Sequence, residues 1–311
     1  MSNQGRGTAT GKIILMGEHA VVYGEPAIAF PFGGTQVTAT VTLSEENKLT
    51  SSYHVGSFDE IPESLTNIQQ LTNKLQNTLH TPNFHLTIES TIPSERGMGS
   101  SAAVAVAITR AFFDWQEQEL TQTALLEWVD FSEAIAHGNP SGIDAAATSG
   151  NAPIYFKRDF PFEAFPLNID AYLLVADTGI KGQTRSAVRA VATLMEQQPE
   201  EVSGIIHQLG QLTQQARTAI IENQADLLGQ LMTQAQTQLK QLTVSNEMLD
   251  DLVSIALNNG ALGAKLTGGG RGGCLLVLIE TNAQAQKIKE AFQAYGVNDV
   301  WLQGLGVYQH V

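Results

Sequence analysis

The stretch PSERGMGSSAA fills residues 93–103, directly before a run rich in alanine and valine that extends to about Trp115. Its two glycines allow the main chain to approach an anion closely, and a helix that begins here directs free N–H groups at the loop. The Ser101 hydroxyl is of the kind that coordinates Mg²⁺ at the end of a phosphate loop. The stretch therefore predicts a phosphate-binding loop and a buried helix, although a glycine turn into a core helix would use the same residues.

The same residues raise a second hypothesis, a dinucleotide-binding site. Gly97–Ala102 matches the G-x-G-x-x-A fingerprint, with Phe84–Ile88 as the strand before it. That fingerprint belongs to a repeating βαβ pattern and needs an acidic residue on the next strand, about 20 residues further on. Here the next element is a second helix, from about Thr121 to Ala136, and the acidic residues at that distance lie at a helix end. The pattern argues against a dehydrogenase.

Around the loop, the N-terminal half combines strands with helices. Residues 8–43 alternate apolar and polar side chains, which predicts strands and hairpins with turns at Gly24-Glu25-Pro26 and Gly33-Gly34. Helical spacing follows at residues 66–80, and Phe84–Glu89 alternates like a strand. This half therefore predicts strand hairpins with buried helices.

The C-terminal half reads as helices with a small sheet. The pattern is almost entirely helical from about Gly182 to Asn259, and another helix is expected near residues 282–294. Short apolar runs predict strands at Tyr172–Ala176, at Cys274–Ile279 and at about 300–307.

The length of the chain favours two lobes. A chain of 311 residues exceeds the size at which most single hydrophobic cores stop growing. The irregular aromatic and proline stretch Asp159–Pro166 is suited to a boundary. We expect an α+β fold with an N-terminal domain at residues 1–168 and a C-terminal domain at residues 169–311.

The charge and composition of the chain limit the kinds of molecule that it is expected to bind. With 17 basic and 31 acidic residues the net charge is −14, so we expect binding neither to nucleic acid nor to a membrane surface. The single cysteine excludes an internal disulfide, and the first ten residues lack the apolar core of a secretory signal. These features predict a soluble cytoplasmic protein. Any polyphosphate must be bound by local positive potential, from main-chain N–H groups, a lysine or a metal.

A second glycine-rich run, KLTGGGRGGC, occupies Lys265–Cys274 and precedes an apolar strand. So many glycines expose main-chain N–H groups to an anion or let another segment pass closely. A plain flexible turn is the simpler interpretation. Cys274 itself is expected to be a buried strand residue, not a nucleophile.

Two carboxylates accompany these loops. Asp144 follows a glycine and proline loop at 137–142, and it would serve either as a helix N-cap or as the acceptor of a proton from a substrate hydroxyl. Glu133 lies eleven residues earlier, in the last turn of the preceding helix, where it would be either an exposed surface residue or a ligand of Mg²⁺.

The motifs of other enzyme classes fit the sequence poorly. Ile13 after Lys12 breaks the Walker pattern, no G-x-S-x-G elbow is present, and no histidine pair has zinc spacing.

Taken together, these segments resemble the GHMP kinase superfamily of galactokinase, homoserine kinase, mevalonate kinase and phosphomevalonate kinase. The three motifs of that superfamily are matched in order by Gly11–His19, by Pro93–Ala103 and by Lys265–Cys274. The runs Gly17–Ala27 and His137–Asp144 are most similar to the mevalonate kinases. The resemblance implies a two-lobed fold, with hairpins and buried helices in the first lobe and helices plus a small antiparallel sheet in the second.

The resemblance also implies an activity, the use of ATP and Mg²⁺ to phosphorylate the 5-hydroxyl of (R)-mevalonate in isoprenoid biosynthesis. Asp144 would be the catalytic base, with Lys12 beside it to stabilise charge on the phosphoryl group. Ser101 and Glu133 would hold Mg²⁺. The residues implied to bind ATP are Pro93, Glu95, Arg96, Gly97, Met98, Gly99, Ser100, Ser101, Ala102 and Ala103. Those implied at the mevalonate end or near the transferred phosphate are Glu18, His19, Ser141, Thr184, Gly268, Gly269 and Gly270.

Two alternatives accompany this interpretation. A phosphomevalonate kinase should have added basic residues near His19 and His137–Asp144, and none is seen there. A ligand-sensing relative without turnover should lack the base or a metal ligand, yet all of these residues are present. The loop departs from the usual small residues at Glu95 and Arg96, and Glu95 is expected to point to solvent. The oligomeric state is left open, with a homodimer as one state that the resemblance allows.

Overall fold

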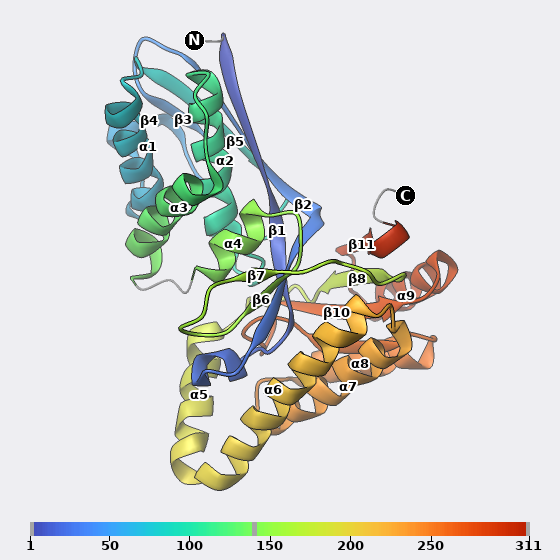
Figure 1. Ribbon diagram of the computed structural model, residues 1–311. Coiled ribbons are helices and arrows are strands. Elements are labelled where there is room, and N and C mark those ends of the chain that lie inside the picture. Colours follow the sequence, from blue (N-terminus) through green and yellow to red (C-terminus); the bar gives the residue numbers. More distant parts are fainter. Residues whose placement is uncertain (1–2, 139–141, 309–311) are drawn as a thin grey trace. The chain divides into compact units, whose positions relative to one another are not determined.

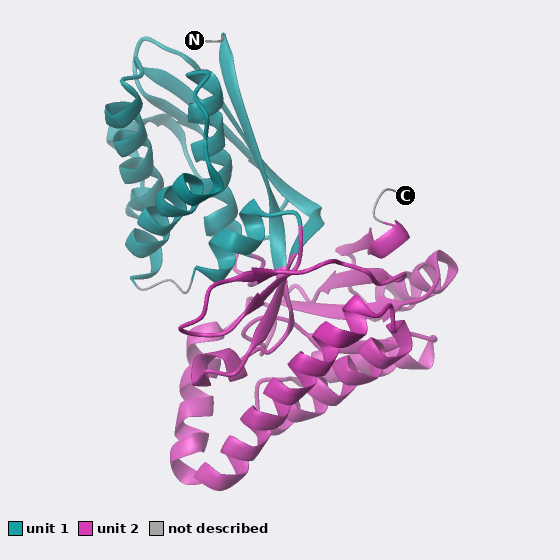
Figure 2. Cartoon of the chain, viewed as in Figure 1, with its two compact units in different colours: residues 1–12, 31–93, 99–151 teal, residues 13–30, 94–98, 152–311 magenta. Residues whose placement is uncertain are grey.

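The computed structural model describes residues 3–138 and 142–308 (Figure 1). The chain forms two compact units, unit 1 with residues 1–12, 31–93 and 99–151, and unit 2 with residues 13–30, 94–98 and 152–311 (Figure 2). The division therefore passes through strands β1 (Gln4–Met16) and β2 (Ala27–Leu43), and between Met98 and Gly99. Among the described residues, no helix combines the length and the apolar character that a bilayer span requires.

Unit 1 is a sheet packed with helices. Strand β2 pairs antiparallel with β5 (Phe84–Ser90), and β5 pairs parallel with β3 (Lys48–Thr50), which in turn pairs with β4 (Val55–Ser57). The helices of this unit are α1 (Thr66–Leu79), α2 (Ser100–Trp115), α3 (Gln122–His137) and α4 (Ile143–Ser149), with short 3-10 turns η2 (Phe58–Glu60) and η3 (Glu63–Leu65).

Helix α2 lies in the core of unit 1, because its alanine, valine and aromatic side chains leave almost no polar face. Close packing against β1 depends on Gly5 and Gly7. A Cβ at either position would clash with the main-chain carbonyl oxygen of Ala111 or Ala107 in α2.

Unit 2 holds a second, antiparallel sheet. Its strand order is β11 (Val300–Gly304), β8 (Tyr172–Asp177), β10 (Cys274–Ile279) and β9 (Gly263–Leu266). Every residue of β10 is buried, so both faces of the sheet are covered at its centre. The remaining elements of the unit are η1 (Ala20–Tyr23), β6 (Ile154–Phe156), β7 (Glu163–Ala164), α5 (Thr184–Gln197), α6 (Pro199–Ile221), α7 (Ala225–Gln241), α8 (Glu247–Asn258), α9 (Asn282–Tyr295) and η4 (Gly306–Tyr308).

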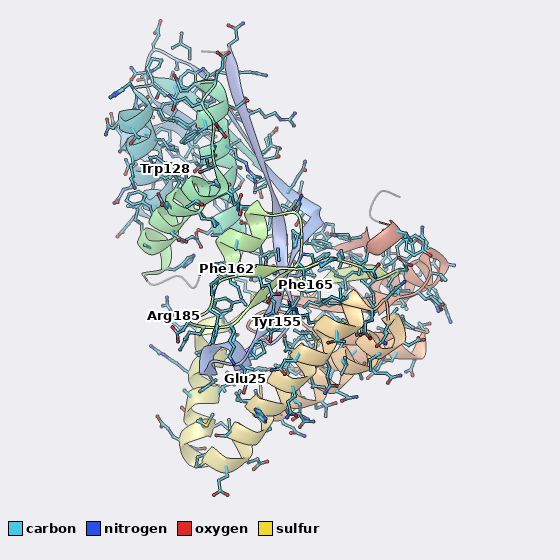
Figure 3. All side chains as sticks on the ribbon, viewed as in Figure 1. Glu25, Trp128, Tyr155, Phe162, Phe165 and Arg185 are labelled. Atoms are coloured by element: carbon cyan, nitrogen blue, oxygen red, sulfur yellow. The ribbon has the colours of Figure 1, made fainter. Side chains whose placement is uncertain are left out.

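An aromatic cluster follows β6 in unit 2. The guanidinium of Arg217 on α6 lies over the rings of Tyr155 and Phe165, at 4.7 and 5.6 Å from their centroids. Figure 3 labels the two aromatic residues. Arg217 also forms an ion pair with Glu163 on β7. These contacts attach the β6–β7 hairpin to α6.

The α+β class and the small antiparallel sheet are confirmed, and so are the helices expected around residues 66–80, 99–115, 121–136 and 282–294. The turn expected at Gly33-Gly34 is wrong, because β2 continues through both residues to Leu43. Neither glycine has a positive φ, so both adopt the extended backbone that any residue can adopt. The last predicted strand is too long, since β11 ends at Gly304 and η4 follows.

The predicted domain boundary after residue 168 stays a prediction. The compact units divide the chain differently, because the short segments 13–30 and 94–98 belong with the C-terminal half. The contacts that these segments make in space, and not their order in the chain, decide which unit they belong to. A change in composition along the sequence does not reveal such contacts.

Helix α9 begins with a complete capping box, in which the Thr281 hydroxyl accepts the N–H of Gln284 and Gln284 Oε1 accepts the N–H of Thr281. We expect Thr281→Ala to lower the free energy of unfolding by about 1 kcal/mol, because the start of the helix loses the hydroxyl that accepts one of its free N–H groups. Urea unfolding of the variant and the parent measures this loss. Thr281→Ser keeps the hydroxyl and should lose less than half as much; equal losses would contradict the capping role.

Candidate active site

A lysine–aspartate ion pair connects β1 to α4 within unit 1. Lys12 Nζ on β1 is 3.1 Å from Asp144 Oδ1, with 7% of the lysine side chain exposed and 38% of the aspartate side chain. Asp144 is the second residue of α4, and the helix N-cap is Gly142 at φ 75°. Asp144 is therefore not the N-cap that its position before an alanine run allowed. Its carboxylate is half open to solvent beside a fixed positive charge, which leaves one side accessible to a substrate.

The second half of the phosphate loop reaches this pair. Gly99 is the N-cap of α2 at φ 70°, a conformation that favours glycine. A Cβ on Gly99 would press against the side chains of Lys12 and Thr148. Three sequence motifs, from β1, the start of α2 and α4, therefore meet within unit 1.

Ser101 and Glu133, the two residues expected to hold Mg²⁺, are in direct contact. The Ser101 hydroxyl donates to Glu133 Oε1 at 2.5 Å. Glu133 on α3 is only 4% exposed, so it is not the surface glutamate that its helical position also allowed. Its other oxygen is 3.8 Å from Nε2 of His137. Burial raises the pKa of Glu133, while the Ser101 hydrogen bond and His137 act in the opposite direction.

An oxygen pair of this kind fits Mg²⁺, which is usually held by one or two protein oxygens together with the phosphates of its substrate. Among the described residues, no group of three or more histidine, cysteine, aspartate or glutamate side chains is placed to hold a metal by itself.

We expect Glu133→Gln to stabilise the metal-free chain near pH 8. Because burial raises its pKa, Glu133 holds its proton more tightly in the native chain than in the unfolded chain. Stability therefore falls as the pH rises from the usual glutamate range through the native pKa, and the full penalty is present above it. The glutamine variant carries no such penalty, so its melting temperature should exceed that of the parent by a few degrees at about pH 8, with the difference shrinking toward about pH 4.

Thermal unfolding in the presence of a chelator measures this gap. Glu127→Gln, a change at the surface of the same helix, is the matched control and should show no pH-dependent gap. A Glu133→Gln variant that is less stable than the parent near pH 8 would contradict the assignment.

In unit 2, the end of β1 is tied to the second glycine-rich run. Glu18 pairs with Lys265 Nζ, with 1% and 0% of the two side chains exposed, and Nζ also donates to the carbonyl of Leu266 at 2.6 Å. The Thr267 hydroxyl donates to the carbonyl of Ile14 at 2.8 Å and accepts the N–H of the same residue. The first and third motifs therefore form one polar connection inside unit 2.

His19 follows Glu18 in a conformation that is rare for a residue with a side chain, at φ 61° and ψ −44°. Its Nε2 lies 3.0 Å from the carbonyl oxygen of Gly269. Burial lowers the pKa of His19, so the ring is neutral near pH 7 and Nε2 donates to that carbonyl. Two contacts therefore hold the strained turn in place. The Glu18 carboxylate pairs with Lys265, and the His19 ring is hydrogen-bonded to the carbonyl of Gly269.

The glycines of the third motif are needed for backbone shape and for close approach. Gly268 and Gly270 have φ of 76° and 74°. A Cβ on Gly269 would collide with Thr184, so this glycine lets the start of α5 pack against the run. Arg185, the next residue, is exposed at the same end of α5 (Figure 3).

The first half of the phosphate loop belongs to unit 2. Glu95 is 61% exposed and forms an ion pair with Lys181, so the expectation that it points to solvent is confirmed. Arg96 pairs with Asp177, and Met98 is buried against Cys274, which is a buried strand residue as expected. The predicted ATP-binding residues are thus distributed over both units.

The remaining predicted residues are placed as follows. Pro93 ends a segment of unit 1, Ser100 is the first residue of α2, and Ala102 and Ala103 are buried in that helix. Ser141 lies outside the described residues.

Two residues that sequence reasoning left without a role are prominent in the structure. Lys265 is a fully buried lysine, and Asp177 holds an arginine of the phosphate loop. Lys265 carried one usable signal, a charge within a strand that is otherwise apolar. Asp177 at the end of a short strand carried none, because its partner lies 81 positions earlier.

Comparison with known proteins identifies the family. The "GHMP kinases N terminal domain" family matches residues 66–151, and the "GHMP kinases C terminal" family matches residues 216–298. The mevalonate kinase of Thermococcus sibiricus is 32% identical over 87% of this chain and 88% of its own.

Comparison with solved structures gives the same family. The mevalonate kinase of L. major, determined in complex with R-mevalonate, has a TM-score of 0.85 at 26% identity and covers 97% of this chain and 96% of its own. The mevalonate kinase of methicillin-resistant Staphylococcus aureus MRSA252 has a TM-score of 0.77 at 32% identity, over 98% of this chain and all (100%) of that one. The chain belongs to the GHMP kinases and, among them, to the mevalonate kinase family.

Proposed function

We propose that this chain transfers the γ-phosphoryl group of ATP to the 5-hydroxyl of (R)-mevalonate, giving 5-phosphomevalonate and ADP in isoprenoid biosynthesis. The Lys12–Asp144 pair carries the proposal, because it places a half-open carboxylate beside a fixed positive charge next to the glycine at the start of α2. Phosphoryl transfer needs in-line positioning and neutralised charge more than covalent participation of the protein.

In this proposal Asp144 accepts the proton of the substrate hydroxyl as its oxygen bonds to phosphorus and the bond to the ADP oxygen breaks. Lys12 holds the carboxylate in place and stabilises negative charge on the phosphoryl oxygens. The free N–H groups at the start of α2 bind phosphate oxygens. Ser101 and Glu133 would hold Mg²⁺, which supplies neutralising charge to the phosphates when it is bound.

The proposal assigns the mevalonate end to residues of unit 2. His19 has its ring direction fixed by Gly269, and Gly268–Gly270 and Thr184 lie around that contact. Glu18 contributes through Lys265 and not by direct contact with substrate, because the pair is buried. Ser141 is proposed to contact mevalonate on the basis of the family resemblance alone.

A coupled ADP-release assay with mevalonate, phosphomevalonate, galactose and homoserine tests the substrate. We expect kcat/KM for mevalonate to exceed that for each of the others by at least about 10³-fold, since sites built to bind a given polar group reject analogues strongly. Equal or greater turnover of any other substrate would overturn the proposal. The relatives that share about a third of their residues with most of this chain are mevalonate kinases, so the phosphomevalonate alternative is not favoured.

A further inference from the structure

Residues 177–184, from the last residue of β8 to the first residue of α5, are hydrogen-bonded to the third motif in unit 2. We call this segment the β8–α5 connector. The N–H and the hydroxyl of Thr178 both donate to the carbonyl of Gly273, at 3.0 and 2.7 Å, and the N–H of Gly273 donates to the carbonyl of Ile180 at 2.8 Å. Gly272 packs so closely that a Cβ there would press on Ile180 and Lys181. The connector is therefore fixed along one side by the glycine-rich run.

Its other side holds the first half of the phosphate loop. Arg96 Nε lies 2.7 and 2.8 Å from the two carboxylate oxygens of Asp177, and Nη2 donates to the carbonyl of Gly179 at 3.1 Å. The N–H of Gly182 donates to the carbonyl of Glu95 at 3.1 Å. The loop is thus bound to the connector at two adjacent residues.

The Arg96–Asp177 pair is enclosed, with 15% and 6% of the two side chains exposed. Asp177 is also fixed by its own main chain, because it ends β8 opposite Cys274 and its N–H donates to the carbonyl of Asp299. Its Oδ1 accepts the N–H of Gly179 as well. A rigid carboxylate at the end of a central strand therefore determines where Arg96, and with it the loop, is placed.

This arrangement changes the role of Arg96. Its positive charge is already matched by Asp177, and all three of its guanidinium nitrogens donate hydrogen bonds inside unit 2, so it is poorly suited to be a phosphate ligand. Resting on the proposed ATP-binding function of the loop, we propose that Asp177 is a positioning residue for the nucleotide, which holds residues 94–98 through Arg96 in the conformation that binds ATP.

Asp177→Asn tests the proposal, because it removes the charge while leaving an amide of the same shape. Freeing even one or two loop residues, which must then be ordered on binding, should weaken ATP affinity by about tenfold or more. We expect the Kd of ATP, measured by calorimetry without mevalonate, to rise by that factor while the KM of mevalonate stays within about twofold. Arg96→Ala should weaken ATP binding similarly, and the double variant should add little, since both changes break one contact.

The matched control is Lys240→Gln, which breaks the Lys240–Asp250 ion pair on the surface of the same unit and should leave ATP affinity unchanged. If Asp177→Asn fails to fold, Arg96→Lys serves instead, because it keeps the charge but loses the paired contact. Its ATP Kd should also rise about tenfold.

An ATP Kd within about twofold of the parent in a folded variant would overturn the proposal. So would parallel rises in the ATP Kd and the mevalonate KM, which indicate a general structural loss. Nucleotide binding is read without turnover, so a parent chain that binds ATP but fails to phosphorylate mevalonate would refute the proposed function and leave this test intact.

Discussion

Asp144→Ala should lower kcat for mevalonate phosphorylation by about 10³-fold, within the range that a positioned general base contributes. The variant removes the carboxylate that forms the ion pair with Lys12. Steady-state turnover and the ATP Kd should be measured together. ATP binding should persist, because the loop, Ser101 and Glu133 are not altered.

Asp144→Asn is the matched variant, since an amide keeps the size and the contact with Lys12 but cannot take a proton at neutral pH. We expect it to be nearly as inactive as the alanine variant. Turnover within about tenfold of the parent in either variant, about 1.4 kcal/mol of barrier, would refute the role of Asp144 as the base. Loss of ATP binding in both would instead assign Asp144 to nucleotide binding.

Lys265→Met should lower the free energy of unfolding by about 3–5 kcal/mol, the cost of leaving one partner of a buried ion pair without the other. Both side chains are essentially inaccessible, at 0% and 1% exposed. Burial lowers the pKa of Lys265, and the Glu18 charge partly offsets this. Once the lysine is gone, the Glu18 carboxylate must be neutralised, hydrated or moved. Urea unfolding of the variant and the parent measures the loss.

The double variant Glu18→Gln with Lys265→Met should recover much of that loss, because no buried charge remains. Lys240→Met is the control, since its ion pair with Asp250 is on the surface and is worth less than about 1 kcal/mol. A single Lys265→Met variant no less stable than the Lys240→Met control would show that the buried pair contributes nothing. We also expect Lys265→Met to raise the KM of mevalonate, since the adjacent strained turn at His19 loses one of its two supports.

Local patterns in the sequence predicted most of the helices and the chemistry of unit 1. The alanine-rich run after Gly99 predicted α2 because only a buried helix accommodates so many small apolar side chains. Asp144 and Glu133 were recognisable as candidates because carboxylates beside glycine turns are unusual. Whether each was catalytic or a surface residue depended on burial, which a single sequence does not contain.

Contacts between distant segments were not predictable from local patterns. Glu18 and Lys265 are 247 positions apart. The residues next to each of them in the sequence give no indication that the two form an ion pair. The turn expected at Gly33-Gly34 failed for a related reason. Glycine tolerates both a turn and an extended strand, and the pairing of β2 with its neighbouring strands, which local sequence does not show, selects the second.

The absence of side chains at Gly5 and Gly7 lets β1 lie directly against the backbone of α2. A methyl group at either position would act as a wedge against α2, and a stiff helix carries such a displacement to its other end, where Ser101 is the second residue. Mutational tolerance should therefore be low at these two positions, although neither residue is proposed to contact a substrate.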